Sequence, residues 1–443
     1  MQRIASTNPA GSISKISPSC IGVTQAWCSL RSSASSSSLL HAAEAENRFV
    51  SRRLLLSRGL RAFADGYVSL LLPIYLLSLG LSPFHVGVLA TATLLGSGVL
   101  TLGVGFYAHR FKYRTLLLAA AALTVATGVG FATITDFWPL LCIALVGTAN
   151  PSRGDASVFL PLEHAVLSGH VDDAERTAAF ARYSLVGSLV GAFGSLAAGA
   201  PDLLVAKAGV DPKGALQAMF FLYAAIGASA ALVYTTLPKE GHAARRRAAP
   251  LKKSKSMVYK LAALFSLDAF SGGLILDSMV VLWLYQKFEL STAVAGTIFL
   301  WAGILSAISY PIAVRIARRF GLVNTMVFTH MPSSAFLILV PFMPTLGWAI
   351  AMLLARSALS QMDVPTRTSY VMAIVPPEER PAAASVTTVP RTLASAAGPL
   401  VAGYLLAISS FGVPLIVAGC LKITYDFMLL FTCRNVKPPE ELT

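Results

Sequence analysis

Long apolar runs separated by short polar stretches fill most of the chain, up to about residue 433. A helix needs about 20 residues to cross the hydrocarbon core of a bilayer, and most of these runs reach that length. The runs predict twelve spans, six in each half, over 59–80, 84–107, 115–135, 137–157, 180–200, 215–237, 258–285, 291–314, 322–343, 346–366, 383–407 and 411–433. We therefore expect an all-α membrane protein.

The second half of the chain repeats the first at a nearly constant distance. Two halves of the same orientation can rock against each other around a central site, as many secondary transporters do. The repeat therefore predicts two pseudo-symmetric six-helix bundles. The matching positions are Leu81-Ser82 with Leu290-Ser291, Arg110-Phe111 with Arg319-Phe320, Asp155 with Asp363, and Glu175 to Gly199 with Glu379 to Gly403.

Composition supports the membrane class and excludes a single soluble domain. The mean hydropathy is +0.67, and charged residues make up 13% of the chain, against about 25% in soluble domains. The net charge of +14 would suggest a nucleic-acid partner in a soluble protein. Here the basic residues gather in alternate loops, as in Arg245-Arg246-Arg247, so we expect no nucleic-acid partner and place these loops and both termini in the cytoplasm or an equivalent compartment.

The ends of the apolar runs divide the chain into five segments. These are a Ser-rich tail over 1–50, an N-terminal bundle over 51–237, a basic cytoplasmic linker over 238–257, a C-terminal bundle over 258–433 and a cytoplasmic tail over 434–443. Residues 1–43 contain no Asp or Glu, which fits a transit peptide, a disordered tail or an upstream start codon equally well. We expect a plasma or inner membrane location, or an organelle membrane if residues 1–43 are a transit peptide.

The sequence contains no constellation typical of an enzyme or a metal site. Five cysteines are present and none forms a CxxC pair, and no Walker loop, HExxH or Gly-x-Ser-x-Gly motif occurs. We therefore expect no enzyme activity, no cofactor and no metal. The expected partners are the lipid bilayer, a small-molecule substrate and protons, and the chain is expected to be a monomer.

Ionisable residues inside membrane spans are costly and are candidates for function. The acids Asp65 and Asp268 begin corresponding spans and could carry a coupling proton, or could form interhelical hydrogen bonds instead. Two arginines could hold an anionic group or bond a helix carbonyl. Lys422 and Asp426 lie on one helix face and could neutralise each other. The substrate or proton candidates are Asp65, Arg182, Asp268, Asp277, Arg356 and Arg391.

A second group of charges lies at the expected cytoplasmic helix ends and recurs in both halves. An Asp–Arg pair in such a place could act as a gating latch between helices, whereas a solvated pair would contribute little. The candidate latch residues are Arg110, Arg114, Asp155, Arg319 and Asp363.

The loop after the second expected span completes a resemblance to the major facilitator superfamily over about residues 55–433. That family's loop reads roughly Gly-x-x-x-Asp-Arg-x-Gly-Arg-Arg/Lys, and the stretch GFYAHRFKYR keeps Gly105, Arg110 and Arg114, with His109 at the Asp position. The second copy, VRIARRFG, keeps Arg319 and Gly321. The resemblance implies the superfamily's fold and alternating access.

The resemblance also bears on direction. The fifth span shows a glycine pattern similar to the exporters' antiporter motif but lacks its Gly-Pro, which only span 11 has, as Gly398-Pro399. The main hypothesis is a secondary active transporter that couples efflux of a small organic compound to protons. The alternatives are uptake or exchange of an organic anion and, from another class, a non-transporting receptor or scaffold with the same fold.

Overall fold

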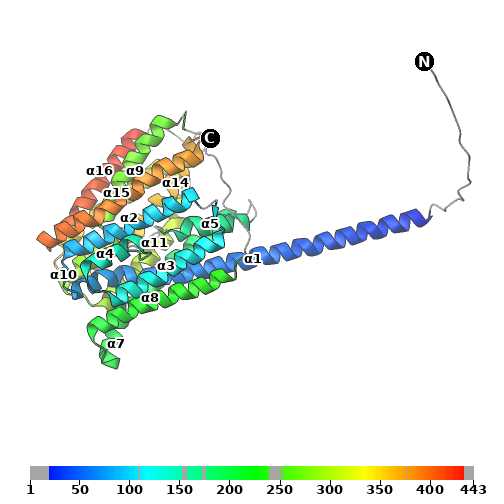
Figure 1. Cartoon of the computed structure of the whole chain (residues 1–443). Coiled ribbons are helices and arrows are strands. Elements are labelled where there is room, and N and C mark those ends of the chain that lie inside the picture. The colour runs from blue at the N-terminus through cyan, green and yellow to red at the C-terminus, as the bar shows by residue number, and fades with distance from the viewer. Residues whose placement is uncertain are drawn as a thin grey trace, which may run out of the picture. The chain divides into compact units, whose positions relative to one another are not determined.

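The computed structural model describes residues 19–107, 110–151, 157–171, 176–238, 251–252, 254–376 and 378–433. These residues are helical or lie in turns and bends, apart from the single-residue bridge at Lys112, and the described part of the chain contains no β-strand. The chain forms two compact units, Met1–Arg52 and Arg53–Thr443, which are treated separately below. The prediction of an all-helical membrane protein is confirmed (Figure 1).

In the first unit, the described residues belong to α1 (Ser19–Ser78), a helix that also supplies the first span of the second unit. The sequence predicts a Ser-rich tail over 1–50, of which residues 19–50 are helical, and the division of the chain at residue 50 stays a prediction. No Pro or Gly, the strongest helix breakers, lies between Gly22 and Gly59, which is consistent with an uninterrupted helix. The transit-peptide interpretation of residues 1–43 stays a prediction.

The first half of the second unit begins with the C-terminal part of α1 and ends with α8. Asp211 and Pro212 show how the sequence starts the last of these helices: the Asp211 carboxylate accepts a hydrogen bond from the Gly214 N–H at 3.1 Å, and Pro212 takes the first helical position. The elements after α1 are α2 (Pro83–Tyr107), α3 (Tyr113–Thr133), α4 (Phe137–Val146), α5 (Phe159–Gly169), α6 (Arg176–Leu196), η2 (Ala197–Gly199), α7 (Ala200–Ala208) and α8 (Pro212–Thr235).

The second half of this unit repeats that order of helices. Ser291 caps the start of α11 by accepting a hydrogen bond from the Val294 N–H at 3.3 Å. The elements are α9 (Lys255–Leu274), α10 (Asp277–Phe288), α11 (Thr292–Phe320), α12 (Leu322–Leu339), η3 (Val340–Phe342), α13 (Leu346–Ser360), α14 (Asp363–Ile374), α15 (Arg380–Ile408) and α16 (Val413–Cys433).

Ten helical segments in the described residues are long and apolar enough to cross a membrane. The expected spans 4 and 10 are not among these ten, because each corresponds to two short helices, α4 with α5 and α13 with α14. Span 7 is also interrupted, between α9 and α10, but its two pieces together are long and apolar enough to cross. Pro365, the third residue of α14, explains the break in span 10: it has no N–H to donate to the carbonyl of Gln361, where α13 has just ended. The broken spans 4 and 10 therefore occupy corresponding positions in the two halves.

The two halves touch where α2 packs against α15 and where α6 with η2 packs against α11. Figure 1 shows α15 running beside α2. Close glycine contacts between the halves lie near the beginning of α2 and of α11, and α2 also approaches α15 further along, where a Cβ on Gly98 would lie 3.4 Å from the Thr392 side chain. One buried apolar core contains residues from both halves there, including Leu89 and Leu406. The halves are thus joined by close contacts of α2 with α15 and of α6 with α11.

Glycines bring the backbones together at both of these contacts. A Cβ on Gly403 would lie 2.7 Å from the Pro83 carbonyl oxygen, and a Cβ on Gly296 would lie 2.5 Å from the carbonyl oxygen of Ser195. A Cβ on Gly87 would collide with the Pro399 carbonyl oxygen. Such close approach is available only to residues without a side chain, which explains glycine at these positions.

Replacing Gly87 by alanine should force α2 away from α15 and weaken the contact between the two halves. We expect lower thermal stability in detergent and slower transport, because the added methyl group meets backbone rather than a flexible side chain. The control is Gly103→Ala on the same helix, where nothing lies within 4 Å of an added Cβ. Equal effects of the two substitutions on the unfolding temperature would contradict this packing.

Candidate functional site

A buried carboxylate, Glu163 of α5, is the centre of a polar cluster in the first half. Its side chain is inaccessible to solvent, forms an ion pair with Arg61 of α1 and accepts a hydrogen bond from the Tyr234 hydroxyl at 2.6 Å. The Tyr183 hydroxyl of α6 also donates to it. Four helices, α1, α5, α6 and α8, are therefore tied to one acidic group.

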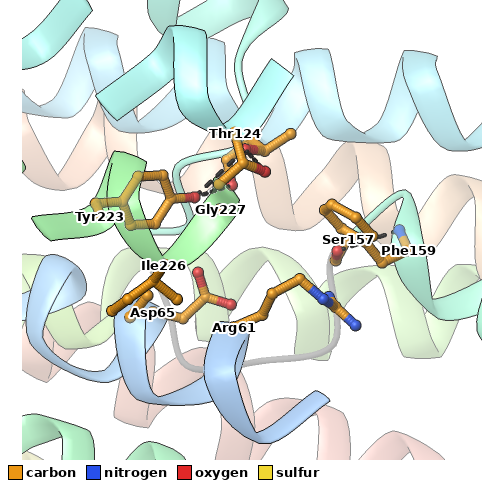
Figure 2. Close-up of a pocket in the computed structure, with 10 residues that line it drawn as sticks. Arg61, Asp65, Thr124, Ser157, Phe159, Tyr223, Ile226 and Gly227 are labelled. Atoms are coloured by element: carbon orange, nitrogen blue, oxygen red, sulfur yellow. Dashed lines mark hydrogen bonds between the residues drawn. The ribbon is translucent and has the colours of Figure 1, made fainter. Parts of the chain in front are cut away.

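Beside this cluster lies a small cavity lined by α1, α3, α8 and the segment between α4 and α5 (Figure 2). Asp65, one turn after Arg61, lines the cavity together with Tyr223. The Tyr223 hydroxyl donates to the Thr148 carbonyl oxygen at 3.0 Å, and the Thr148 hydroxyl donates to that of Thr124 at 2.9 Å. The cavity thus has a polar wall of hydroxyl groups and one acidic group.

The Arg61 guanidinium turns away from Asp65 in Figure 2 and lies 4.0 Å from the centre of the Phe159 ring. Its charge is engaged by Glu163. Among the residues that the structure describes, the Asp65 carboxylate accepts no hydrogen bond, although Arg61 and Arg58 act on it electrostatically. Asp65 is therefore the acid of this cavity, half-buried and without a short-range partner in the described chain.

The second half contains a larger buried network centred on Asp268 of α9. One carboxylate oxygen accepts a hydrogen bond from Lys422 of α16 at 2.7 Å, and the other accepts one from Arg367 of α14 at 3.0 Å. Arg367 also donates to Asp363, one turn earlier on α14, at 2.5 Å. All four side chains are at most a tenth exposed. Opposite charges and hydrogen bonds compensate one another here, as buried charges require.

The same network continues to α12 through His330. The imidazole Nδ1 lies 2.9 and 3.0 Å from the two carboxylate oxygens of Asp426, which is fully buried on α16. The Nε2 atom lies 3.5 Å from the Lys422 Nζ and 3.8 Å from an oxygen of Asp268. The i,i+4 pair Lys422 and Asp426 therefore does more than neutralise itself, because each member bonds a group on another helix.

Each half contains a buried ion pair, called a clamp below, and the helices that supply its acidic and basic partners are exchanged between the halves. In the first half, Arg61 on the first span pairs with Glu163 on the second piece of span 4. In the second half, Asp268 on the corresponding span pairs with Arg367 on the second piece of span 10. Each pair ties the first helix of a bundle to its broken helix.

The remaining deep candidates lie around the C-terminal network. Asp277 begins α10 and is half-buried, and the neighbouring Ser278 N–H donates to the Pro151 carbonyl oxygen of the other half at 3.3 Å. Arg356 on α13 is half-buried and interacts electrostatically with Asp277 and Asp268. Arg391 is exposed on α15 and interacts electrostatically with Asp268 and Asp363. Arg182 is exposed on α6.

Two of the candidate latch residues, Asp363 and Arg319, lie in different environments. Asp363 was expected at a cytoplasmic helix end, yet it begins α14, is 4% exposed and bonds Arg367. Arg319 is exposed and lies 5.5 Å from the centre of the Phe320 ring. Asp363 therefore has its partner one turn away on α14, and a gating role for Asp363 and Arg319 stays a prediction.

The other latch residues lie at the edge of the first bundle. Arg114, near the beginning of α3, donates to the Leu237 carbonyl oxygen at 3.4 Å, and Arg110 is exposed. Asp155 lies outside the described residues. A gating role for these three residues stays a prediction.

A double-mutant cycle can test the pairing of Asp363 with Arg367. We expect Asp363→Asn and Arg367→Gln to destabilise the protein less in combination than the sum of the single changes, because Asp363 has already lost its partner in Arg367→Gln. The matched cycle of Asp363→Asn with Arg319→Ala should be additive within about 0.5 kcal/mol. The measurement is detergent-induced unfolding. Additivity of the first cycle, or coupling in the second, would contradict the geometry.

Sequence reasoning missed Glu163, Arg61, Arg367 and His330. For two of them a signal was present, since Arg61 precedes Asp65 and Arg367 follows Asp363 at the i,i+4 spacing of a helical ion pair. No group of three or more His, Cys, Asp or Glu side chains suited to a metal ion occurs in the described residues.

The comparisons with known proteins agree with this architecture. A family model described as Major Facilitator Superfamily matches residues 54–355 and 261–443. The uncharacterized membrane protein YJR124C of Saccharomyces cerevisiae is 24% identical over 406 residues, which cover 84% of this chain and 91% of the yeast protein.

Three solved structures show the same fold at low sequence identity. An inward-facing, unoccupied bacterial homolog of the human lysosomal transporter Spinster has a TM-score of 0.64 and 14% identity, covering 88% of this chain and 96% of its own. The nucleoside transporter NupG has a TM-score of 0.66 and 12% identity, covering 86% of this chain and 98% of its own. The human organic anion transporter MFSD10 (TETRAN) has a TM-score of 0.57 and 18% identity, covering 86% of this chain and 99% of its own. With two bundles, broken spans 4 and 10 and a family model matching nearly the whole chain, this multi-pass membrane protein belongs to the major facilitator superfamily.

Proposed function

We propose that the protein is a secondary active transporter that moves a small organic compound by alternating access and couples this movement to protons. The observation that carries the proposal is Asp65, an acid that lines the cavity of the first bundle beside the satisfied Arg61–Glu163 pair. A carboxyl group in a membrane span is costly when ionised, so it has a reason to bind and release a proton.

The glycine contacts between the halves support movement of one half against the other. Contacts such as Gly87 with Gly403 bring the backbones of α2 and α15 together. Rocking of one bundle against the other would separate these backbones and expose the central site to the other side. The buried clamps within each bundle, Arg61–Glu163 and Asp268–Arg367, would keep each half rigid during that motion.

Coupling at Asp65 follows from the charge of the cavity. With Arg61 engaged by Glu163, ionisation of Asp65 adds one negative charge to this side of the cavity, and protonation of Asp65 removes it. Binding of a proton and binding of a cationic group would therefore exclude each other there. Such competition couples the two fluxes in opposite directions, as proton-driven efflux requires.

Efflux is supported by Gly398-Pro399, which resembles the glycine-proline pair in the antiporter motif of exporters. In α15 this pair packs against α9, where a Cβ on Gly273 would meet the Gly398 Cα at 3.0 Å. The same region of α15 also touches α2 of the other half through Pro399. A change in this contact would thus reach both bundles.

A second candidate function, uptake or exchange of an organic anion, is favoured by Arg391. This side chain is exposed on α15, and Arg356 lies half-buried nearby in the electrostatic environment of Asp268. Planar guanidinium groups bind carboxylates and phosphates in bidentate fashion. The name of the structural neighbour MFSD10, an organic anion transporter, points in the same direction.

Flux measurements in proteoliposomes separate these functions. Purified protein would be tested with a panel of cationic, zwitterionic, neutral and anionic organic solutes, each under inward, outward and zero pH gradients. The proposal predicts accumulation of a cationic or neutral compound against its gradient, with its direction reversed when the pH gradient is reversed. Movement of anions independent of the pH gradient would support the second candidate. No flux of any solute would favour a receptor or scaffold.

A further inference from the structure

We propose that His330 and Asp426 form a proton-binding site in the second bundle, and that Lys422 transmits its occupancy to Asp268 on α9. The site is separate from Asp65, which belongs to the first bundle. The inference rests on the proposed function only for the use made of the proton, because proton binding itself can be measured without transport.

The local geometry defines where the first hydrogen lies. Asp426 is fully buried, and His330 Nδ1 faces both of its carboxylate oxygens at 2.9 and 3.0 Å. When Asp426 is ionised, its carboxylate only accepts hydrogen bonds, so Nδ1 then carries the hydrogen of the neutral imidazole. The other nitrogen, Nε2, then has a lone pair, which can accept a hydrogen bond from the Lys422 ammonium 3.5 Å away.

Addition of a proton changes only Nε2. An imidazolium can no longer accept from Lys422, and its positive charge repels the ammonium group. The new N–H instead lies 3.8 Å from the same Asp268 oxygen that Lys422 bonds at 2.7 Å. His330 and Lys422 therefore compete for one acceptor, and protonation shifts the balance towards His330.

The buried acid supplies the reason for binding a proton here. With His330 neutral, the His330–Asp426 pair carries one negative charge in a site closed to solvent, and one added proton makes the pair neutral overall. Among the described residues, His330 is the hydrogen-bonding partner of the Asp426 carboxylate. The proton comes from water and no other bond is broken.

The other charged groups around His330 act at longer range. On α14, Arg367 and Asp363 bond each other and Asp268. From α15 and α13, Arg391 and Arg356 act electrostatically on Asp268. On α16, Tyr425 packs edge-on against the imidazole at 6.0 Å between ring centres. The charged residues of α11, which are Arg315, Arg318 and Arg319, are exposed in its last turns.

Asp268 is the group whose hydrogen bonds change when His330 binds a proton. Its carboxylate joins Lys422 on α16 to Arg367 on α14, so a change in the Lys422 bond alters the link between three helices. The helix α9 that carries Asp268 packs against α15, which in turn contacts α2 of the other bundle. The effect of a proton on His330 can therefore reach the contact between the halves through a continuous series of packed helices.

The test is nitrogen NMR of the full chain, labelled at histidine and reconstituted in lipid nanodiscs, titrated from pH 4 to pH 9. The chain has seven histidines, and the His330 signals are assigned as those lost in His330→Gln. We expect the Nδ1–H tautomer at high pH and protonation of Nε2 as the pH falls. The control is His85, whose Nδ1 lies 2.7 Å from the Ser82 hydroxyl oxygen.

Two variants should shift the His330 titration in opposite directions. Asp426→Asn removes the stabilising carboxylate and should lower the midpoint by about one pH unit or more, whereas Lys422→Gln removes the repelling ammonium and should raise it. The His85 midpoint should stay fixed in both. If Asp426→Asn fails to fold, the midpoint of the His330 titration in Lys422→Gln still tests the proposal.

The proposal is overturned if His330 keeps one tautomer without charge throughout the titration, or if its midpoint is the same in wild type and Lys422→Gln. A titrating His330 in a protein that shows no proton-driven flux would support the site and reject the proposed function. Asp65→Asn should leave the His330 midpoint unchanged, which separates the two acids.

Discussion

Replacing Glu163 by alanine is expected to destabilise the folded protein by about 3–5 kcal/mol, the range seen when one partner of a buried ion pair is removed. The change leaves the Arg61 guanidinium, which is 5% exposed, without its counter-charge. It also removes the acceptor of the Tyr183 and Tyr234 hydroxyls. Unfolding in sodium dodecyl sulfate, followed by circular dichroism, measures the effect.

Two further variants make this expectation specific. Replacing both Arg61 and Glu163 by leucine should recover a large part of the lost stability, because neither member of the pair is then left buried without its counter-charge. Glu378→Ala, at an exposed glutamate near the start of α15, should change stability by about 0.5 kcal/mol or less. Equal losses for Glu163→Ala and the double leucine variant would show that the pair is not the cause.

The second large effect is expected for Asp65→Asn, which should abolish accumulation driven by a pH gradient and leave exchange of substrate largely intact. Asparagine retains the size and polarity of the side chain but cannot bind and release a proton, whereas exchange requires only binding and rocking. We expect accumulation to fall by about tenfold or more. Uptake of the transported compound is measured with and without a pH gradient, and with the same compound inside.

The matched control for Asp65→Asn is Asp202→Asn. Asp202 is exposed on α7, where its carboxylate accepts a hydrogen bond from the Ala293 N–H at 3.2 Å. Asparagine can keep that bond, so proton-driven accumulation should survive. If Asp65→Asn accumulates substrate with unchanged pH dependence, Asp65 serves only as a structural group.

Much of the fold could be predicted because a bilayer demands long apolar helices, and ten such helices occur in the described chain. The breaks in spans 4 and 10 could not, since apolarity alone does not show where a helix is interrupted. The expected span 4 ends at residue 157, and the structure has a further helix beyond it, Phe159–Gly169. Pro365 gave a signal for the other break.

The candidate site could be predicted in part, because charged side chains are costly inside a membrane span. Asp65 and Asp268 stood out because acids are rare in membrane spans, and the structure places one in a cavity and the other in a network. Glu163 was missed together with α5. His330 was missed because a single histidine in an apolar run does not reveal its partner, and Asp426 lies 96 residues further along the chain.

Substrate-driven proton movement tests the central claim most directly. Proteoliposomes would contain a pH-sensitive dye and the transported compound, with equal pH on both sides, and would then be diluted into buffer without the compound. The account predicts that outward flow of the compound drives protons inward and acidifies the interior in wild type, and that Asp65→Asn releases the compound without a change in pH. Release of the compound from wild type with no change in internal pH, or the same acidification in Asp65→Asn, would contradict it.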